Sequence, residues 1–243
     1  MDGTIEIARK YSAKVYEHPF EGYASQRNWA LRNLAFAHEW VFFLDADEIV
    51  SDELKDELTH VFAAELRGID GFYLKRRLIF MGKWIKWGGC YPLWLLRIFR
   101  HEKTWCDARS VNEHFVVSGP TSRLRNDIIH KDNRGMSHWI EKHNKYAALE
   151  ATEMMKAASS DACSGIRPRL FGSQPERKEW LRRVLWNRMP FLVRPFFYFT
   201  YRYILRLGIL DGREGFIYHF LQGLWFLLLV DLKYIEMTRK KKR

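Results

Sequence analysis

The chain has 243 residues, of which 47% are apolar, enough for a sizeable core in one large domain or in a domain with an appendage. Its net charge of +11 indicates an anionic partner, and 10 Trp, 11 Tyr and 17 Phe favour a membrane interface or a carbohydrate and nucleotide site. No pattern typical of a helix-turn-helix, a zinc finger or an RNA-recognition motif occurs, so we expect no nucleic-acid partner. The three cysteines are dispersed and indicate a reducing compartment.

The first half of the chain alternates between helix and strand patterns. We expect the end of a helix at 4–11, a short strand at 13–16, a helix at 24–38 and then a strand that ends at Asp45. Ser51 is a good N-cap, and the apolar positions after it predict an amphipathic helix up to Leu66. Beyond Gly68 the sequence favours strands at 72–80, 94–99, 114–117 and 124–130. An α/β sheet is the natural inference.

The sequence becomes helical from Gly135 onward. Residues 137–156 contain neither Pro nor Gly and predict one helix, whereas 159–175 indicate a loop. A nearly continuous apolar run at 216–232 is interrupted by two polar residues, and the chain ends in a basic run at 239–243. We therefore expect helices that lie in a membrane interface rather than a membrane-spanning helix. The alternative is a helical subdomain packed on the sheet or on a twin subunit.

Asp45 and Asp47 follow a run of apolar and aromatic residues that begins at Trp40. Strand alternation would turn both carboxylates to the same side, where they could hold Mg²⁺ or Mn²⁺ together with a phosphate ligand. Acid pairs at strand ends also occur as helix N-caps or solvated loop residues, so the pair alone is a weak signal.

Three further positions carry side chains suited to this chemistry. Gln26, Arg27 and Asn28 begin a predicted helix, whose N-terminus favours an anion; otherwise they form a polar helix face. Glu113 stands beside an imidazole and could act as a general base, or it could pair with a nearby arginine. His130, at the end of a predicted strand, is a candidate ligand of a metal or a phosphate, or a structural histidine.

Taken in order, these segments resemble glycosyltransferase family 2 enzymes of the GT-A type, near those of lipopolysaccharide-core and cell-surface polysaccharide synthesis. The resemblance rests on six segments, namely 22–30, 43–48, 112–114, 130–135, 139–146 and 210–215. It covers nearly the whole chain, and the ordered set is more specific than any one motif.

The resemblance implies a Rossmann-like α/β nucleotide-sugar domain at 1–135 and an α-helical, basic and aromatic region at 136–243. It implies metal-dependent, inverting transfer of a sugar from a nucleotide-sugar donor to a lipid-linked or cell-surface glycan. Glu113 takes the position of the catalytic base, and Asp45, Asp47 and His130 take those of the metal site. The implied donor-binding residues are Asp2, Gln26, Arg27, Asn28 and Asp45. The enzyme would act in the cytoplasm, peripherally on the inner face of the cell membrane, and contact anionic lipid.

One departure from the family concerns the start of the sequence. Such enzymes begin with a strand, a helix and a second strand that leads into a turn rich in Asp and Gly, and this sequence starts inside that turn, at Asp2-Gly3-Thr4. We therefore expect a strand-helix-strand unit of roughly 30 residues to be absent, and donor binding to be poor. The alternative function is a non-catalytic scaffold or binding protein on the membrane surface, derived from such an enzyme.

Overall fold

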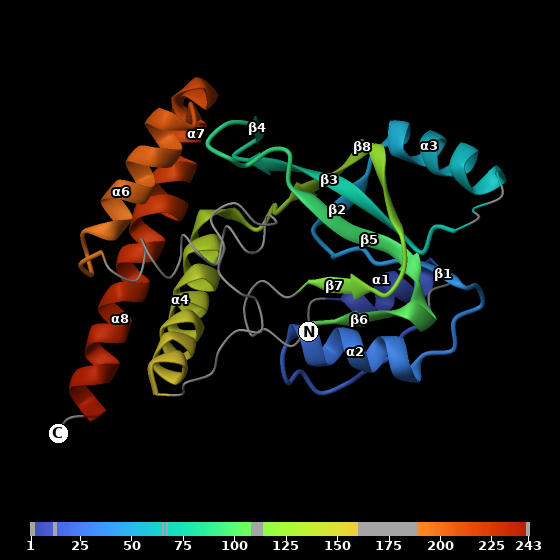
Figure 1. The fold of residues 1–243 in the computed structure, drawn as a ribbon, viewed down its shortest axis with the longest axis horizontal. Helices are drawn as coiled ribbons and strands as arrows, with labels where there is room; N and C mark the ends of the chain where they lie inside the picture. The colour runs from blue at the N-terminus through green and yellow to red at the C-terminus, as the bar shows by residue number, and fades with distance from the viewer. Residues whose placement is uncertain are drawn as a thin grey trace.

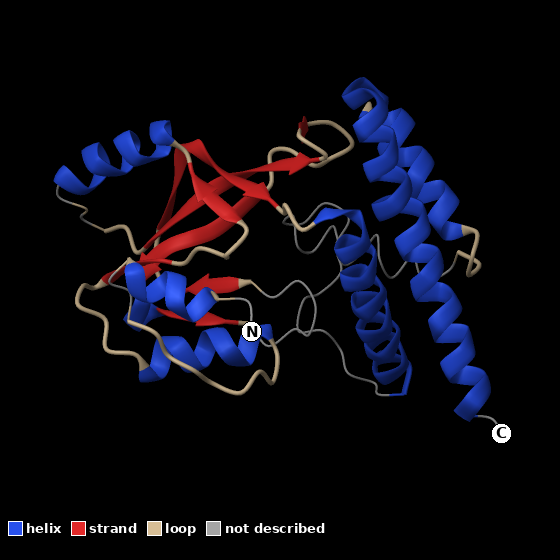
Figure 2. Cartoon of the chain, turned by 180° about the vertical axis from the view of Figure 1, so that it is seen from behind, coloured by secondary structure: helices blue, strands red, loops and turns tan. Residues whose placement is uncertain are grey.

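A computed structural model describes residues 3–11, 14–64, 66, 68–107, 114–159 and 189–241. They form a mixed, curled sheet with helices packed against it, followed by a helical C-terminal region beside the sheet (Figure 1, Figure 2). The predicted α/β class with a helical C-terminal region is thereby confirmed. The division at residue 135 stays a prediction.

The main sheet has the strand order β1-β5-β3-β8-β2, and β4 pairs with β3. β3 and β8 run parallel, whereas the other pairs are antiparallel. Two short strands form a separate antiparallel pair. The strands are β1 (Trp40–Phe42), β2 (Glu48–Val50), β3 (Gly71–Phe80), β4 (Lys83–Ile85), β5 (Trp94–Arg100), β6 (Thr104–Cys106), β7 (Phe115–Val117) and β8 (Thr121–Lys131).

Two short helices, α1 (Thr4–Lys10) and α2 (Tyr23–Asn33), lie beside the β6–β7 pair, and α3 (Asp52–Ala63) packs on the main sheet (Figure 1). As predicted, the Ser51 hydroxyl caps α3, because its oxygen accepts a hydrogen bond from the Leu54 N–H at 3.2 Å. Leu54 is fully buried in a core that also contains Phe72, Leu74 and Ile128. The capped helix thus fixes one face of the sheet by apolar burial.

The C-terminal region is built from a long helix, α4 (Gly135–Ser159), and a set of helices that packs on it. The set consists of α6 (Arg194–Thr200), η3 (Tyr201–Leu205), η4 (Gly208–Asp211), α7 (Gly212–His219), η5 (Phe220–Trp225) and α8 (Phe226–Lys241). Ala147 of α4 packs against Phe226 and Val230 of α8. Gly208–Lys240 is the one helical stretch in the described part of the chain that is long and apolar enough to cross a membrane, and core helices of soluble proteins pass the same test.

The C-terminal region is tied to the loop between β4 and β5 by a buried carboxylate. Asp211 accepts hydrogen bonds from the backbone N–H groups of Lys86 and Trp87, at 3.1 and 2.8 Å. Arg202 donates to the carbonyl oxygen of Gly88 at 2.8 Å in the same contact. Because these bonds join segments more than a hundred residues apart in sequence, they dock the helices onto the sheet.

Three local predictions are wrong. Residues 14–20 form no regular structure although 13–16 reads as a strand, since no neighbouring strand among the described residues pairs with them. The strand expected to run to Asp45 ends at Phe42, and the α2 helix ends at Asn33 instead of His38 because Leu34 is extended. Asp45 and Asp47 consequently lie in the turn between β1 and β2, where strand alternation does not govern their directions.

Candidate functional site

The turn after β1 is held by bonds between its own residues. The backbone N–H of Glu48 donates to the Asp45 carbonyl oxygen at 2.9 Å, and the Asp45 N–H donates to the Glu48 carboxylate at 3.1 Å. Glu48 is the first residue of β2 and lies opposite His130 of β8. The turn therefore presents its acids at a fixed place beside the sheet.

Asp45 lies between two arginines. Its two carboxylate oxygens pair with Arg27 of α2 at 3.1 Å and with Arg97 of β5 at 2.6 Å. The same Arg97 nitrogen lies 2.5 Å from a Glu48 oxygen, and both of these side chains are almost completely buried. Asp45 itself keeps 35% of its side chain exposed, so it is the member of this group that a ligand reaches.

Arg27 is positioned by aromatic rings as well as by its acid. Its guanidinium carbon lies 5.5 Å from the Phe43 ring centre and 5.4 Å from that of Phe115. Such contacts hold a cation over a ring face by electrostatic attraction. The neighbouring Asn28 makes two 2.8 Å hydrogen bonds with the backbone of Cys106, one as donor and one as acceptor. These bonds fix the middle of α2 against β6.

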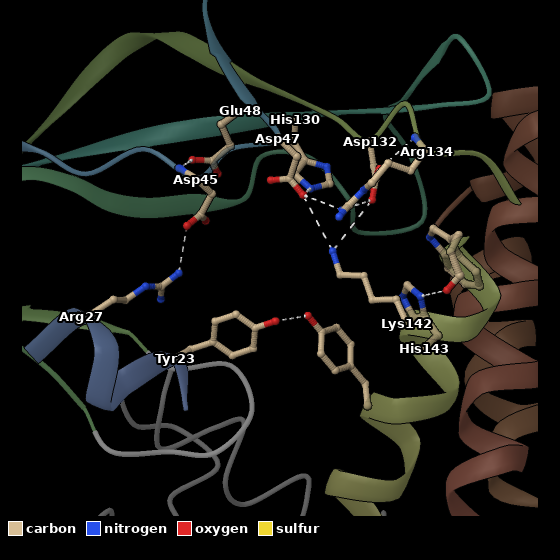
Figure 3. A network of polar contacts seen from close by, with 12 residues as sticks. Tyr23, Arg27, Asp45, Asp47, Glu48, His130, Asp132, Arg134, Lys142 and His143 are labelled. Carbon is tan, nitrogen blue, oxygen red and sulfur yellow. Dashed lines mark hydrogen bonds and ion pairs between the residues drawn. The ribbon is translucent and has the colours of Figure 1, made fainter. Parts of the chain in front are cut away.

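Asp47 faces a different set of partners, from β8 and α4. One of its oxygens lies 3.3 Å from His130 Nε2, 3.8 Å from Lys142 Nζ and 4.0 Å from Arg134 Nη2 (Figure 3). The hydrogen bond with His130 is the main cause that lowers the pKa of Asp47, and the charge of Lys142 adds to it. Asp47 is thus held as a carboxylate next to three nitrogen-bearing side chains.

Asp132 anchors the two cations that flank Asp47. It accepts a forked pair of hydrogen bonds from Arg134 at 2.8 and 2.7 Å, and Lys142 lies 3.9 Å away (Figure 3). The bonds from Arg134 hold the pKa of Asp132 well below its usual range. The Arg134 side chain is about half exposed, which leaves part of its hydrogen-bonding edge open to a ligand.

Hydroxyl groups join the α2 side of the site to the α4 side. The Tyr23 and Tyr146 oxygens are 2.8 Å apart, and Figure 3 shows this pair below the acids, between α2 and α4. On α2, the Gln26 side-chain oxygen accepts a hydrogen bond from His18 Nδ1 at 3.1 Å. The structure therefore brings together side chains from α2, the β1–β2 turn, β8 and α4.

Asp47 and His130 offer an oxygen and a nitrogen ligand for a divalent cation side by side, and the buried Nδ1 of His130 has no hydrogen-bond partner within the described residues. Mg²⁺ and Mn²⁺ favour hard oxygen ligands such as the Asp47 carboxylate and leave positions for phosphate oxygens, whereas imidazole is the softer ligand of the two. However, Asp45 faces arginines, and no cluster of three His, Cys, Asp or Glu ligands exists in the part of the chain that the structure describes. The Asp47 carboxylate and the His130 imidazole can bind a divalent cation. Asp45 could become a ligand only if it gave up its pairing with Arg27 or Arg97.

The structure brings together most of the residues that the sequence singled out. Arg27 meets Asp45, and Asp47 meets His130, whereas Asp2 and Glu113 lie outside the described residues. The donor and metal roles of all these residues, including Gln26 and Asn28, stay predictions. Four partners were missed by sequence reasoning, namely Glu48, Arg97, Arg134 and Lys142. Glu48, Arg134 and Lys142 stand within segments already singled out, whereas Arg97 was considered only as one of the arginines that could pair with Glu113.

Comparisons with known proteins agree with this picture. Residues 1–107 match the family model described as Glycosyl transferase family 2. The chain is 28% identical over 177 residues to the lipopolysaccharide core biosynthesis glycosyltransferase LpsC of Rhizobium meliloti, across 70% of this chain and 62% of that protein. It is 41% identical over 63 residues to an uncharacterized glycosyltransferase of Rickettsia conorii and 40% identical over 63 residues to one of Rickettsia typhi.

The matched part covers less than two thirds of each relative. It spans 62% of LpsC, 22% of the Rickettsia conorii protein and 21% of the Rickettsia typhi protein. The two Rickettsia matches each involve 26% of this chain. The predicted family 2 resemblance is confirmed for residues 1–107.

Proposed function

We propose that residues 1–107, a glycosyl transferase family 2 domain, work with the C-terminal helices to move a sugar from a nucleotide-sugar donor to a saccharide acceptor. The observation that carries this proposal is the meeting of Asp45 and Asp47, inside the family match, with cations from α2, β5, the segment between β8 and α4, and α4. Four cations and two carboxylates around one turn suit a ligand with both a diphosphate and hydroxyl groups.

The cations would bind the donor's diphosphate and stabilise it as it leaves. Lys142 and Arg134 face Asp47 at 3.8 and 4.0 Å, distances that leave room to turn toward phosphate oxygens. Asp45, partly exposed between Arg27 and Arg97, would accept hydrogen bonds from donor hydroxyl or base groups. The Arg27 guanidinium is held over the Phe43 ring, which restricts it beside Asp45.

A divalent cation, Mg²⁺ or Mn²⁺, is part of the proposal. Asp47 and His130 would hold it, with Asp45 as a third ligand after it leaves an arginine. When bound, such an ion supplies positive charge that neutralises the nucleoside diphosphate leaving group. Lys142 and Arg134, which contact the same Asp47 oxygen as His130, supply the same kind of charge.

Glu113 is proposed as the general base that removes the proton from the acceptor hydroxyl. The sugar would then pass to the acceptor in a single displacement, with inversion at the anomeric carbon. Because proton transfer by a positioned carboxylate accelerates a reaction by about 10² to 10⁴, this role predicts a loss in turnover, not in affinity.

The acceptor is proposed to be a lipid-linked or cell-surface glycan, reached from an anionic membrane surface in the cytoplasm. Support comes from the exposed apolar side chains that α6, η3, η4 and α7 present, including Phe197 at 61% and Leu205 at 71% exposure. Isolated exposed apolar residues are ordinary, but a concentration of them marks an interaction surface. The C-terminus lies at the opposite end of α8 from α7 (Figure 1), so the basic run and these apolar residues would contact a membrane at separate places.

The proposed activity is tested by incubating the purified chain with a panel of radiolabelled nucleotide-sugars and a phosphorylated core oligosaccharide, with Mn²⁺, with Mg²⁺ and with chelator. We expect label to enter the oligosaccharide with one donor, and to do so only with metal. Donor binding measured by calorimetry separates poor binding from failed chemistry. Absence of both transfer and donor binding with every donor would contradict the proposal and favour the non-catalytic scaffold.

The membrane part has its own test. Phe197→Ser and Leu205→Ser together should weaken cosedimentation with vesicles of phosphatidylglycerol and phosphatidylcholine several-fold, because they remove exposed apolar area. Leu149→Ser, on the exposed side of α4, is the matched control. If the double variant instead changes the mass measured by light scattering and leaves cosedimentation intact, the surface packs on a twin subunit.

A further inference from the structure

A row of alternating cations and aromatic rings crosses β3, β4, β5 and β8. We call it the cation–aromatic ladder and define it as Lys75, Arg77, Trp84, Lys86, Trp94 and Arg123. None of these residues takes part in the site around Asp45 and Asp47. The ladder is therefore a second collection of positive charge with no role in the proposed donor chemistry.

Strand register brings the ladder together. Lys75 of β3 lies opposite Trp94 of β5 on one side and Asp127 of β8 on the other. Arg77 is two residues further along β3, and alternation places it on the same face as Lys75. Trp84 of β4 lies opposite Ile79, the next residue of that face. The arrangement thus follows from the sheet and not from a chance meeting of loops.

Each tryptophan of the ladder lies between two cations. Arg77 and Lys86 both approach the Trp84 ring centre at 4.5 Å, while Arg123 and Lys75 approach that of Trp94 at 4.9 and 5.8 Å. Contacts of this kind restrict long flexible side chains. Cations restricted in this way lose less conformational entropy when they bind an anion.

The positive charge of the ladder is incompletely neutralised. Asp127, almost fully buried, pairs with Lys75 at 3.4 Å and with Arg77 at 3.1 Å, and it accepts a hydrogen bond from the Tyr91 hydroxyl at 3.1 Å. Lys86 and Arg123 are exposed, and neither has an acidic partner among the residues that the structure describes. Two charged ends are therefore open to solvent on a face whose geometry is fixed from below by Asp127.

We propose that the cation–aromatic ladder binds phosphate or carboxylate groups of an anionic saccharide. Guanidinium and ammonium groups at fixed spacing match such anions in charge and in hydrogen-bonding capacity. Single-stranded nucleic acid, the other polyanion that uses aromatic side chains, needs free ring faces for its bases. Cations lie over the ladder's tryptophan rings instead, which favours the saccharide. The binding of an anionic saccharide by the ladder does not rest on the proposed function.

The test uses the full chain and a deacylated, phosphorylated core oligosaccharide, with its enzymatically dephosphorylated form as a second probe. The variant carries Lys86→Gln and Arg123→Gln, and the control carries Lys10→Gln and Arg32→Gln, which remove the same charge from exposed positions on α1 and α2. We expect calorimetry to show at least ten-fold weaker binding of the phosphorylated probe to the ladder variant, no change for the control, and weak binding of the dephosphorylated probe to all three proteins.

Other outcomes overturn the proposal. The proposal would be excluded if the original chain bound the phosphorylated and dephosphorylated probes equally well. It would also be excluded if the ladder variant and the control variant lost the same amount of affinity for the phosphorylated probe. A loss confined to vesicles of phosphatidylglycerol would assign the ladder to lipid headgroups, and a loss confined to single-stranded DNA would assign it to nucleic acid. Donor binding and sugar transfer are measured in parallel with oligosaccharide binding. If the original chain shows no transfer but the ladder variant loses oligosaccharide binding, the ladder proposal is supported and the proposed function is contradicted.

Discussion

Arg97 donates to Glu48 at 2.5 Å where both side chains are almost fully buried, and the same nitrogen reaches Asp45 at 2.6 Å. The pair links β5, which lies next to β1, to the start of β2, the strand that follows the acid turn. A buried charge that loses its partner is costly, whereas an intact pair contributes little net stability. Arg97 is therefore a positioning residue for Asp45, and its main effect is on the turn.

Replacing Arg97 with Met should destabilise the fold by about 3 to 5 kcal/mol, because Glu48 is left buried without a cation. Adding Glu48→Gln to that variant should restore part of the stability by removing the unpaired charge. Urea unfolding of the single and double variants measures both effects. A double variant as unstable as the sum of the two single ones would show that the residues do not act as a pair.

Asp47→Asn should abolish metal-dependent sugar transfer and leave the fold intact. The carboxylate interacts with His130, Lys142 and Arg134 and is partly exposed, so its removal costs the core little. Transfer assays with and without Mn²⁺, together with circular dichroism, check both parts. Full activity in this variant would contradict the metal assignment, and Asp52→Asn, at an exposed acid on α3, is the control.

Glu113→Gln should lower turnover by about 10² to 10⁴ and leave the donor dissociation constant unchanged, as expected for a general base. Steady-state kinetics gives turnover, and calorimetry with the nucleotide-sugar gives affinity. A pure loss of affinity would instead indicate a structural role for Glu113. The pH profile provides a second readout, since the variant should lose the acidic limb that a base imposes.

Asp211→Asn should loosen the contact between the C-terminal helices and the β4–β5 loop. The amide can offer only one oxygen to the N–H groups of Lys86 and Trp87, and its own N–H₂ group faces donors. We expect a loss of about 1 to 3 kcal/mol in unfolding free energy. Hydrogen exchange at Lys86 and Trp87 should accelerate, and unchanged exchange there would show that other contacts hold the loop.

Stability should fall in mild acid because of His219. This residue is fully buried, neither ring nitrogen has a hydrogen-bond partner within the described residues, and burial lowers its pKa to about 4, with a smaller effect from Arg202. The unfolded chain protonates His219 more readily than the folded one. The free energy of unfolding is therefore unaffected by this residue above about pH 6.5, and it falls by roughly 3 kcal/mol as pH decreases toward 4.

His219→Phe keeps a flat ring and removes the titration. The unfolding free energy of the variant should therefore fall less between pH 7 and pH 4 than that of the original chain. The ring packs tightly against Gly88, where an added Cβ would lie 2.1 Å from His219, so the substitution also changes packing. The slope with pH, and not the absolute stability, is thus the quantity to compare, and parallel slopes would exclude His219 as the cause.

Sequence reasoning predicted those features that depend on local pattern. Ser51 as the cap of α3 and the strands β3, β5, β7 and β8 follow from side-chain type and spacing alone, whereas the short strands β4 and β6 were not predicted. The pairing of Asp47 with His130 was predicted through family resemblance, which supplies a contact between distant segments. The directions of Asp45 and Asp47 were not predictable, since they depend on where β1 ends and hence on the register of β5.

The same limit applies to the residues that sequence reasoning missed. Arg97 reaches Asp45 because β5 lies next to β1, and Lys142 reaches Asp47 because α4 follows β8 back across the site. Both contacts are consequences of strand order. A local stretch of sequence shows which residues are present but not which strands become neighbours.

Strand β8 carries Asp127, at the base of the ladder, and His130, beside Asp47, three residues apart. An odd spacing along a strand points the two side chains to opposite faces. Inserting or deleting one residue between them would turn one of the two to the wrong face. The length of this short stretch therefore cannot drift during evolution without disabling one ligand surface, and engineered changes of specificity should leave it untouched.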